Sequence, residues 1–213
     1  MAAPLPKVTW SFSSQGDPSA QWRVVRVHCR EALSETYTAT LDLANQDLAA
    51  DPDLLLGRGC ELITRRDAHA VRLCGVVHRV EHRGTTAGHL LARAHVVPAL
   101  HALAQRTNSL IFQEKTVPEI LAAVLNAGLT PFNRSHRLDL QRTYPKREYC
   151  VQYRETDLEF VERLMAEEGI AYRFDHAGAE ELMVLFDANT PLPAFVTMDG
   201  GAVEIQGPAH GTA

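Results

Sequence analysis

The stretch REYCVQYRETDLEFVERLMAEEGIAYRF, residues 147–174, decides the fold, because it contains the signals of a strand, a helix and a second strand in direct succession. Residues 149–153 alternate at the period of two that is typical of a half-buried strand. Thr156 and Glu159 have the spacing of a capping box, and Gly169 is placed where a helix ends. Strand period resumes at Ile170, Tyr172 and Phe174. The pattern predicts a helix over 157–168 with a strand on each side.

Acidic residues are dense along this stretch, and they form either an active site or the solvated side of a helix. Glu159, Glu162 and Arg163 fall opposite the apolar stripe of the helix, and Glu159 with Arg163 has the spacing of a surface pair contributing roughly 0.3–0.5 kcal/mol. Asp157 lies in the first turn, where the helix dipole favours an anion. Glu168 falls in the apolar sector, so it either reaches solvent past the helix end or meets a basic partner. We interpret these acids as structural or solvated.

The apolar stripe, which we expect to be buried, consists of Leu158, Phe160, Val161, Leu164 and Met165.

A second helix is predicted upstream by TVPEILAAVLNAG, residues 116–128. Thr116 and Glu119 form another capping box, and Pro118 lies in the first turn, where its missing N–H costs little. We expect the helix to cover about 116–127 and Gly128 to end it. Its apolar stripe consists of Val117, Ile120, Leu121, Val124 and Leu125.

The first hundred residues have the period of β-strands. TYTATLDL, residues 36–43, alternates cleanly, and residues 21–33, 71–83 and 89–97 are further strand-like runs separated by turn residues. Several short strands at this spacing favour a small antiparallel barrel or sandwich from about residue 5 to residue 100. The expected buried face of residues 36–43 consists of Tyr37, Ala39, Leu41 and Leu43. Downstream, ELMVLFDA resembles a partner strand for residues 170–174.

The composition excludes several classes of protein. The chain has 213 residues, 46% hydrophobic and 22% charged, with a net charge of -5, so no basic field attracts nucleic acid or an anionic membrane. The N-terminus lacks the pattern of a signal peptide, and no apolar run is long enough to span a bilayer. The four cysteines are far apart and form no CxxC pair, which favours reduced thiols in the cytoplasm over a disulfide or zinc framework: Cys29, Cys60, Cys74 and Cys150.

No motif of catalytic or metal chemistry stands out. His78 and His82 are four apart in a strand-like run, which separates them by more than about 10 Å, and GRG at residues 57–59 is typical of a turn rather than a phosphate loop. GxSxG, P-loop and HExxH motifs are absent from the sequence. Trp10 and Trp22 lie in β segments, where we expect core roles. We therefore predict a non-enzymatic interaction or structural protein, with no catalytic, cofactor-binding or metal residue and with its binding residues unknown.

Several long motifs, in the right order, resemble one family. TYPKREYCVQYRETDLEFVERLMAEEGIAYRF at 143–174 strongly resembles the signature of the VgrG family, the spike proteins of bacterial type VI secretion systems. GVVHRVEH at 75–82, NSLIFQEKTVPEILAAVL at 108–125 and LMVLFD at 182–187 fit the same family. The resemblance is densest over residues 73–187 and looser before them, where only the strand pattern and the DLLLG turn agree.

The resemblance implies a mainly β fold with an α+β segment, similar to the baseplate hub of contractile phage tails. The implied domains are a first hub-like β-barrel over 1–104, a helix-containing α+β connecting segment over 105–190, and the truncated start of, or linker to, a second barrel over 191–213. Family members form trimers that lie on the hexameric Hcp tube protein and meet baseplate proteins, a PAAR tip and effectors. The oligosaccharide-binding-type barrel and the needle of the family are missing from this sequence, so it corresponds to the front of a spike protein, and we expect it to associate weakly by itself.

Three alternatives remain open: the hub of a phage or phage-like contractile tail, a non-catalytic β-barrel that binds an oligosaccharide or peptide, and an enzyme. The sequence shows no nucleophile–base arrangement that would support the enzyme. The resemblance further implies assembly in the bacterial cytoplasm and export by the type VI machine without a signal peptide. It implies no cofactor, no nucleic acid and no stable membrane insertion.

Overall fold

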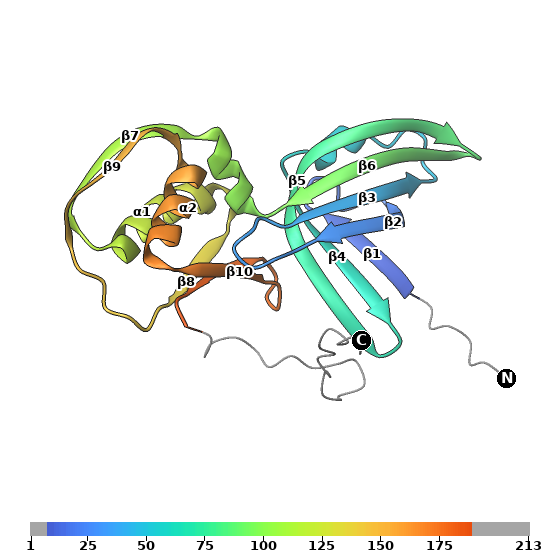
Figure 1. Ribbon diagram of the computed structural model, residues 1–213. Helices are drawn as coiled ribbons and strands as arrows, with labels where there is room; N and C mark the ends of the chain where they lie inside the picture. The colour runs from blue at the N-terminus through green and yellow to red at the C-terminus, as the bar shows by residue number, and fades with distance from the viewer. Residues whose placement is uncertain (1–7, 189–213) are drawn as a thin grey trace, which may run out of the picture.

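The computed structural model describes residues 8–188 and has two halves (Figure 1). We call strands β1 to β6 the curled sheet, and the elements from β7 to β11 the α+β half. The predicted domain limits at 104, 105 and 190 stay predictions, and the segment 191–213 lies outside the described residues, as do residues 5–7 of the expected barrel.

The strands of the curled sheet are β1 Val8–Ser14, β2 Arg23–Arg30, β3 Thr38–Asn45, β4 Gly59–Arg66, β5 His69–Thr86 and β6 His89–Val97. The later elements are β7 Thr107–Lys115, α1 Val117–Leu129, β8 Ser135–Asp139, β9 Arg147–Thr156, α2 Asp157–Glu168, β10 Ala171–Asp175 and β11 Leu182–Phe186, and the short 3-10 helices are η1 Pro52–Leu55, η2 Ala99–Gln105 and η3 Thr130–Phe132.

The curled sheet is antiparallel, with the strand order β1-β4-β5-β6-β3-β2. Strand β5 is 18 residues long, and its pairing with β6 is irregular between Val77 and Arg79 and again between His82 and Thr85. Such bulges bend a strand and increase its twist, so the sheet curls into a half-barrel (Figure 1). The expected mainly β fold with an α+β segment is confirmed.

The core of the curled sheet confirms the predicted faces, with one exception. The side chains expected to share the inner face of residues 36–43 are all buried: Tyr37, Ala39, Leu41 and Leu43. Trp22 is buried as predicted, but Trp10 is exposed, so its expected core role is wrong. The reason is that Trp10 lies on the edge strand β1, which has a neighbouring strand on one side only.

The α+β half places two helices between a small sheet and a ribbon. Strand β11 pairs antiparallel with β10 as predicted and parallel with β8, which the sequence did not indicate. The helices α1 and α2 contact each other and η2, and β7 pairs with β9 as a separate two-stranded ribbon. In Figure 1 this ribbon arcs around the helices at the end of the molecule away from the curled sheet.

Both predicted capping boxes form. Thr116 accepts from the Glu119 backbone N–H and Thr156 from that of Glu159, and each glutamate carboxylate returns to the backbone N–H of its threonine. Gly169 ends α2 in the left-handed region at φ 62. Gly128 does not end α1, because the helix continues through it to Leu129.

The two apolar stripes are buried where the helices meet the rest of the half, Leu158 being partly buried. The expected Glu159–Arg163 pair is wrong, because the Glu159 carboxylate is held in the cap and Arg163 instead binds Glu155 at 2.7 Å and Glu167 at 3.1 Å. Glu168 meets a basic partner, with its Oε1 at 2.6 Å from Nη2 of Arg147. Glu162 is partly buried rather than fully solvated.

Candidate functional site

The residues that carried chemical interest in the sequence do not converge. His78 packs edge-on against His101 with ring centroids 4.6 Å apart, whereas His82 Nε2 lies 2.9 Å from Asp53 Oδ1. Within residues 8–188, no group of three or more His, Cys, Asp or Glu side chains is arranged to hold a metal ion. All four cysteines are free thiols, and Gly57 of the GRG segment occupies a turn at φ 72 as predicted. Burial raises the pKa of the Cys60 thiol to about 12, which keeps it protonated and unreactive at neutral pH.

The two halves meet at the β10–β11 loop, residues 176–181, which reaches from the α+β half to the curled sheet. Arg72 of β5 donates to the Gly178 carbonyl at 2.7 Å, and the Cys74 backbone N–H donates to Nδ1 of His176 at 3.2 Å. Gly75, next along β5, leaves no room for a side chain, because a Cβ there would lie 2.7 Å from the Tyr37 hydroxyl. The loop is therefore closely fitted to the inner end of the sheet.

Glu181 is the centre of this junction and is buried. Its Oε1 accepts from the Ala99 backbone N–H at 2.5 Å, and its Oε2 contacts the Tyr37 hydroxyl. Burial raises the pKa of Glu181 to about 7, against the opposing effects of the hydrogen bonds from Tyr37 and Ala99 and of the Arg134 charge. Burial and the neighbouring Glu181 likewise raise the pKa of Tyr37. The sequence predicts Glu181 only as the first residue of a strand, because nothing local distinguishes it.

Arg134, which directly precedes β8, supplies a positive charge near Glu181. Its side chain is buried and pairs with Glu180 Oε2, and its Nη1 donates to the Phe132 carbonyl at 3.0 Å. Its Nε lies 3.9 Å from Glu181 Oε1 and, among the described residues, has no hydrogen-bond partner. One guanidinium thus faces two adjacent carboxyl groups.

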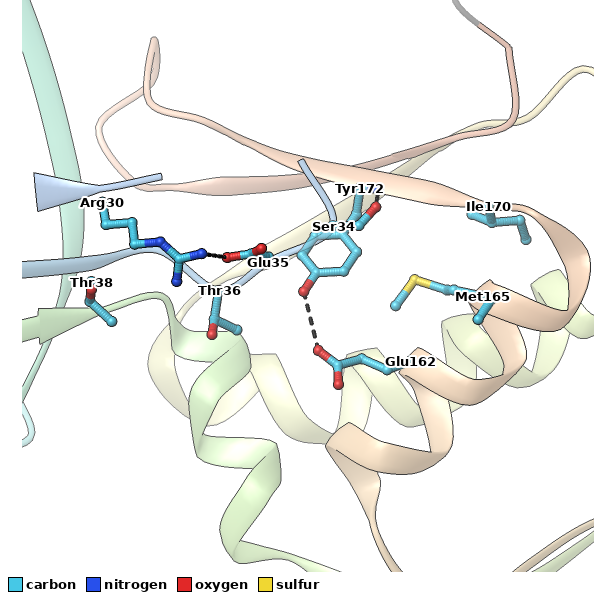
Figure 2. Close-up of a pocket in the computed structure, with 10 residues that line it drawn as sticks. Arg30, Ser34, Glu35, Thr36, Thr38, Glu162, Met165, Ile170 and Tyr172 are labelled. Atoms are coloured by element: carbon cyan, nitrogen blue, oxygen red, sulfur yellow. Dashed lines mark hydrogen bonds and ion pairs between the residues drawn. The ribbon is translucent and has the colours of Figure 1, made fainter. Parts of the chain in front are cut away.

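A cleft of about 630 Å³ opens beside this junction, between the segment that joins β2 to β3 and helix α2. Figure 2 shows Tyr172 directing its hydroxyl at Glu162, whose Oε1 accepts at 3.2 Å, and Arg30 paired with Glu35 at 2.8 Å. Burial raises the pKa of Glu162. The Ser34 backbone N–H donates to the Tyr172 carbonyl, and the Ser34 hydroxyl accepts from the Tyr172 N–H. The Ser34 hydroxyl therefore joins the two halves at the cleft, and it is not arranged as an activated nucleophile.

The ribbon presents an apolar outer face to solvent. Ile111 of β7 lies opposite Val151 of β9, and both are exposed, by 67% and 46%. Tyr149 and Tyr153 flank Val151 on the same face and are 59% and 67% exposed. We call these four side chains the ribbon face. The alternate residues Phe112 and Cys150, also opposite each other, turn inward to the helices.

A search of the helices within residues 8–188 finds none that combines the length and the apolar character needed to cross a membrane.

Solved structures of other proteins share this fold. The E. coli c3393 protein, described as a type VI secretion component with structural similarity to the T4 phage tail proteins gp27 and gp5, matches 87% of this chain and 51% of its own at a TM-score of 0.76 and 24% identity. A tail protein from Neisseria meningitidis matches 84% of this chain and 50% of its own at a TM-score of 0.56 and 14% identity. The Francisella PdpA–VgrG complex matches 85% of this chain and 28% of its own chain at a TM-score of 0.57 and 12% identity. The fold is that of a phage-tail-like hub.

The sequence comparisons identify the family. The family model described as "Phage tail baseplate hub (GPD)" matches residues 30–213, and the chain belongs to this family. It is 36% identical over 172 residues to the type VI secretion system spike protein VgrG4b of Pseudomonas aeruginosa, covering 80% of this chain and 21% of the relative. It is 33% identical over 195 residues to the actin cross-linking toxin VgrG1 of Vibrio cholerae, covering 83% of this chain and 17% of the relative. The chain thus spans about a fifth of the length of these relatives. The resemblance to the VgrG spike proteins is confirmed.

Proposed function

We propose that this chain is the hub portion of a trimeric type VI spike that caps the Hcp tube and, in a full-length protein, carries a needle and effectors. Its role is geometric: it adapts a threefold spike to a sixfold tube and turns over no substrate. Assembly takes place in the bacterial cytoplasm, and the spike is delivered through the type VI machine. The observation that carries the proposal is the ribbon face, an exposed apolar surface at the end of the molecule away from the curled sheet (Figure 1).

The inner side of the ribbon fixes this surface in place. Gln152 of β9 donates to Asp157 Oδ1 at 2.8 Å, and Asn108 of β7 donates to the same oxygen at 2.8 Å. Arg106 completes the binding of the buried Asp157 carboxylate, with its Nε 3.0 Å from Oδ2. Both strands are therefore anchored to the first turn of α2, and the ribbon face keeps one shape.

The ribbon face of one copy contacts a neighbouring copy of the same chain. Contiguous apolar patches on a soluble protein mark contact sites, and tyrosine is enriched in protein interfaces. In a ring, each copy contacts the next through two different surfaces, and the ring closes when the rotation is threefold. A ribbon at one end of an elongated protomer is suited to such a head-to-tail contact.

The test uses a full-length spike protein that contains this chain. Ile111→Glu and Tyr153→Glu place a charge on the ribbon face without touching its anchored side, so each should reduce the trimer fraction in light scattering and the amount of Hcp released by cells. Val71→Glu is the matched control, because Val71 is 68% exposed but lies on β5 of the curled sheet. The proposal fails if both ribbon variants trimerise and support Hcp release as well as the control does.

A further inference from the structure

The Tyr37 hydroxyl has one proton and faces two acceptors. Its oxygen lies 2.5 Å from the Cys74 carbonyl and also contacts Oε2 of Glu181. If Glu181 is ionised, Tyr37 donates to one acceptor, and the other contact places lone pairs against lone pairs. If Glu181 is protonated, its O–H donates to Tyr37 and Tyr37 donates to Cys74, so both contacts are hydrogen bonds. The hydrogen bonds of Tyr37 therefore favour the neutral carboxyl of Glu181.

The charges around Glu181 also favour its neutral carboxyl. Arg134 is the guanidinium that faces Glu181, and it already pairs with Glu180. The Cys60 and Cys74 thiols, which face the cluster from β4 and β5, are neutral, since burial raises the pKa of each. The group formed by Arg134, Glu180 and Glu181 is electrically neutral when Glu181 carries its proton, and it has one excess negative charge when Glu181 is ionised.

His176 is a further titratable group beside Tyr37. Its Nδ1 accepts the Cys74 N–H at 3.2 Å, so this nitrogen carries no proton, and its ring packs against Tyr37 at 5.4 Å. Burial lowers the pKa of His176, which keeps the ring neutral. The imidazole therefore supplies no positive charge that would stabilise an ionised Glu181.

The place of Glu181 in the chain makes its proton matter to the arrangement of the two halves. It directly precedes β11 of the α+β half, and its two oxygens contact Ala99 in η2 and Tyr37, which directly precedes β3. These contacts bring the β10–β11 loop against the curled sheet. An added charge at Glu181 acts on the junction itself.

We propose that Glu181 is a proton-dependent latch, which in its neutral form holds the curled sheet against the α+β half and on ionisation loosens the junction. The inference is independent of the proposed hub function. Burial raises the pKa of Glu181 to about 7, so the folded chain retains a proton that the unfolded chain, with an ordinary glutamate pKa, has lost. A raised carboxyl pKa stabilises the folded state at low pH, and the effect is lost as the pH rises through the folded pKa. This stabilisation should therefore be lost between about pH 4 and pH 7, that is, between the ordinary and the raised pKa of the carboxyl.

The test compares the wild-type chain with Glu181→Gln. The glutamine amide can donate to Tyr37 and accept from Ala99 as the neutral carboxyl does, but it cannot ionise. Relative to Glu181→Gln, which cannot ionise, the wild-type Tm should fall by roughly 4–8 °C from pH 5.5 to pH 8.5. Hydrogen exchange at the Ala99 amide, corrected for the intrinsic rate, should accelerate with pH in the wild type only. Glu180→Gln is the adjacent comparison: it frees Arg134 to pair with Glu181 and should move the fall to lower pH.

A direct titration makes the result independent of the variants. The side-chain carboxyl carbon of Glu181, followed by NMR in the wild-type chain, should titrate with a midpoint near 7. A midpoint near the ordinary glutamate value overturns the proposal. An unchanged pH dependence of Tm in a folded Glu181→Gln variant also overturns it, and if that variant does not fold, the carbon titration decides alone.

Discussion

The Phe160 ring of α2 stacks on the Phe112 ring of β7, with centroids 5.8 Å apart and 12° between the planes. Arg163 lies over the same Phe160 ring at 5.4 Å. A single aromatic side chain therefore joins the helix to the ribbon that we propose as a contact surface between copies. The ribbon is thus anchored to α2 by this contact as well as by the buried Asp157.

Replacing Phe160 should be costly to the fold. Phe160 is fully buried, and Phe160→Ala should lower the free energy of unfolding by about 3–5 kcal/mol, the range for deleting a large core side chain. Glu148→Ala, at an exposed position of β9, should change it by less than about 0.5 kcal/mol. Urea denaturation measures both. Equal effects would contradict the assigned faces of α2 and the ribbon.

The capping box of α2 gives a second prediction. The Thr156 hydroxyl accepts from the Glu159 backbone N–H at 3.1 Å, so Thr156→Ala should cost about 1 kcal/mol of stability. Thr156→Ser keeps the acceptor and should retain most of the stability, as should Glu159→Gln, which can still reach back to the cap. The same urea measurements apply. A Thr156→Ser variant as unstable as Thr156→Ala would show that the methyl group, not the cap, matters.

Helix α2 was predictable because its signals are local. The cap at Thr156, the stripe containing Phe160 and the left-handed Gly169 all lie within fourteen residues of one another. The partner of Arg163 was not predictable, because the spacing that matched Glu159 ignored the use of that carboxylate in the cap. A local pattern therefore fixes the helix better than it fixes the pairing of side chains that have two possible uses.

Gly128 reverses the usual effect of glycine in a helix. In an open helical position, Gly→Ala stabilises by up to about 1 kcal/mol. Here a Cβ would lie 2.4 Å from Cδ1 of the buried Leu103, so Gly128→Ala should destabilise the chain by roughly 1–3 kcal/mol through overpacking.

The control for this prediction is the Leu103→Ala background, where the added methyl group has room. There the same substitution should cost much less, which a double-mutant cycle by urea denaturation would detect as coupling. A more stable Gly128→Ala single variant would show that Leu103 moves aside freely. The predicted end of α1 at Gly128 was wrong for this reason: the position needs a small side chain for packing and not for a left-handed turn.

The junction was not predictable from the sequence, because its members meet only in the folded chain. Tyr37 and Glu181 are 144 residues apart, and Arg134 comes from a third segment. Strand β8 was missed for a related reason, since its parallel pairing with β11 joins distant segments. By contrast, the hub family could be inferred from long motifs that need no knowledge of contacts.

The oligomeric state gives the last prediction. The ribbon face consists of four side chains, fewer than the 20–30 residues a side that a standard stable interface of about 800 Å² per partner contains. The chain alone should therefore sediment mainly as a monomer at micromolar concentration in analytical ultracentrifugation. A protein extended to the length of the VgrG relatives should form a trimer, because three intertwined needle chains would supply the association energy that the ribbon face lacks. Ile111→Glu in the long protein should weaken the trimer, and Val71→Glu should not. A stable trimer of the 213-residue chain would place the main driving force in the hub, whereas a long protein that stays monomeric would contradict the hub proposal itself.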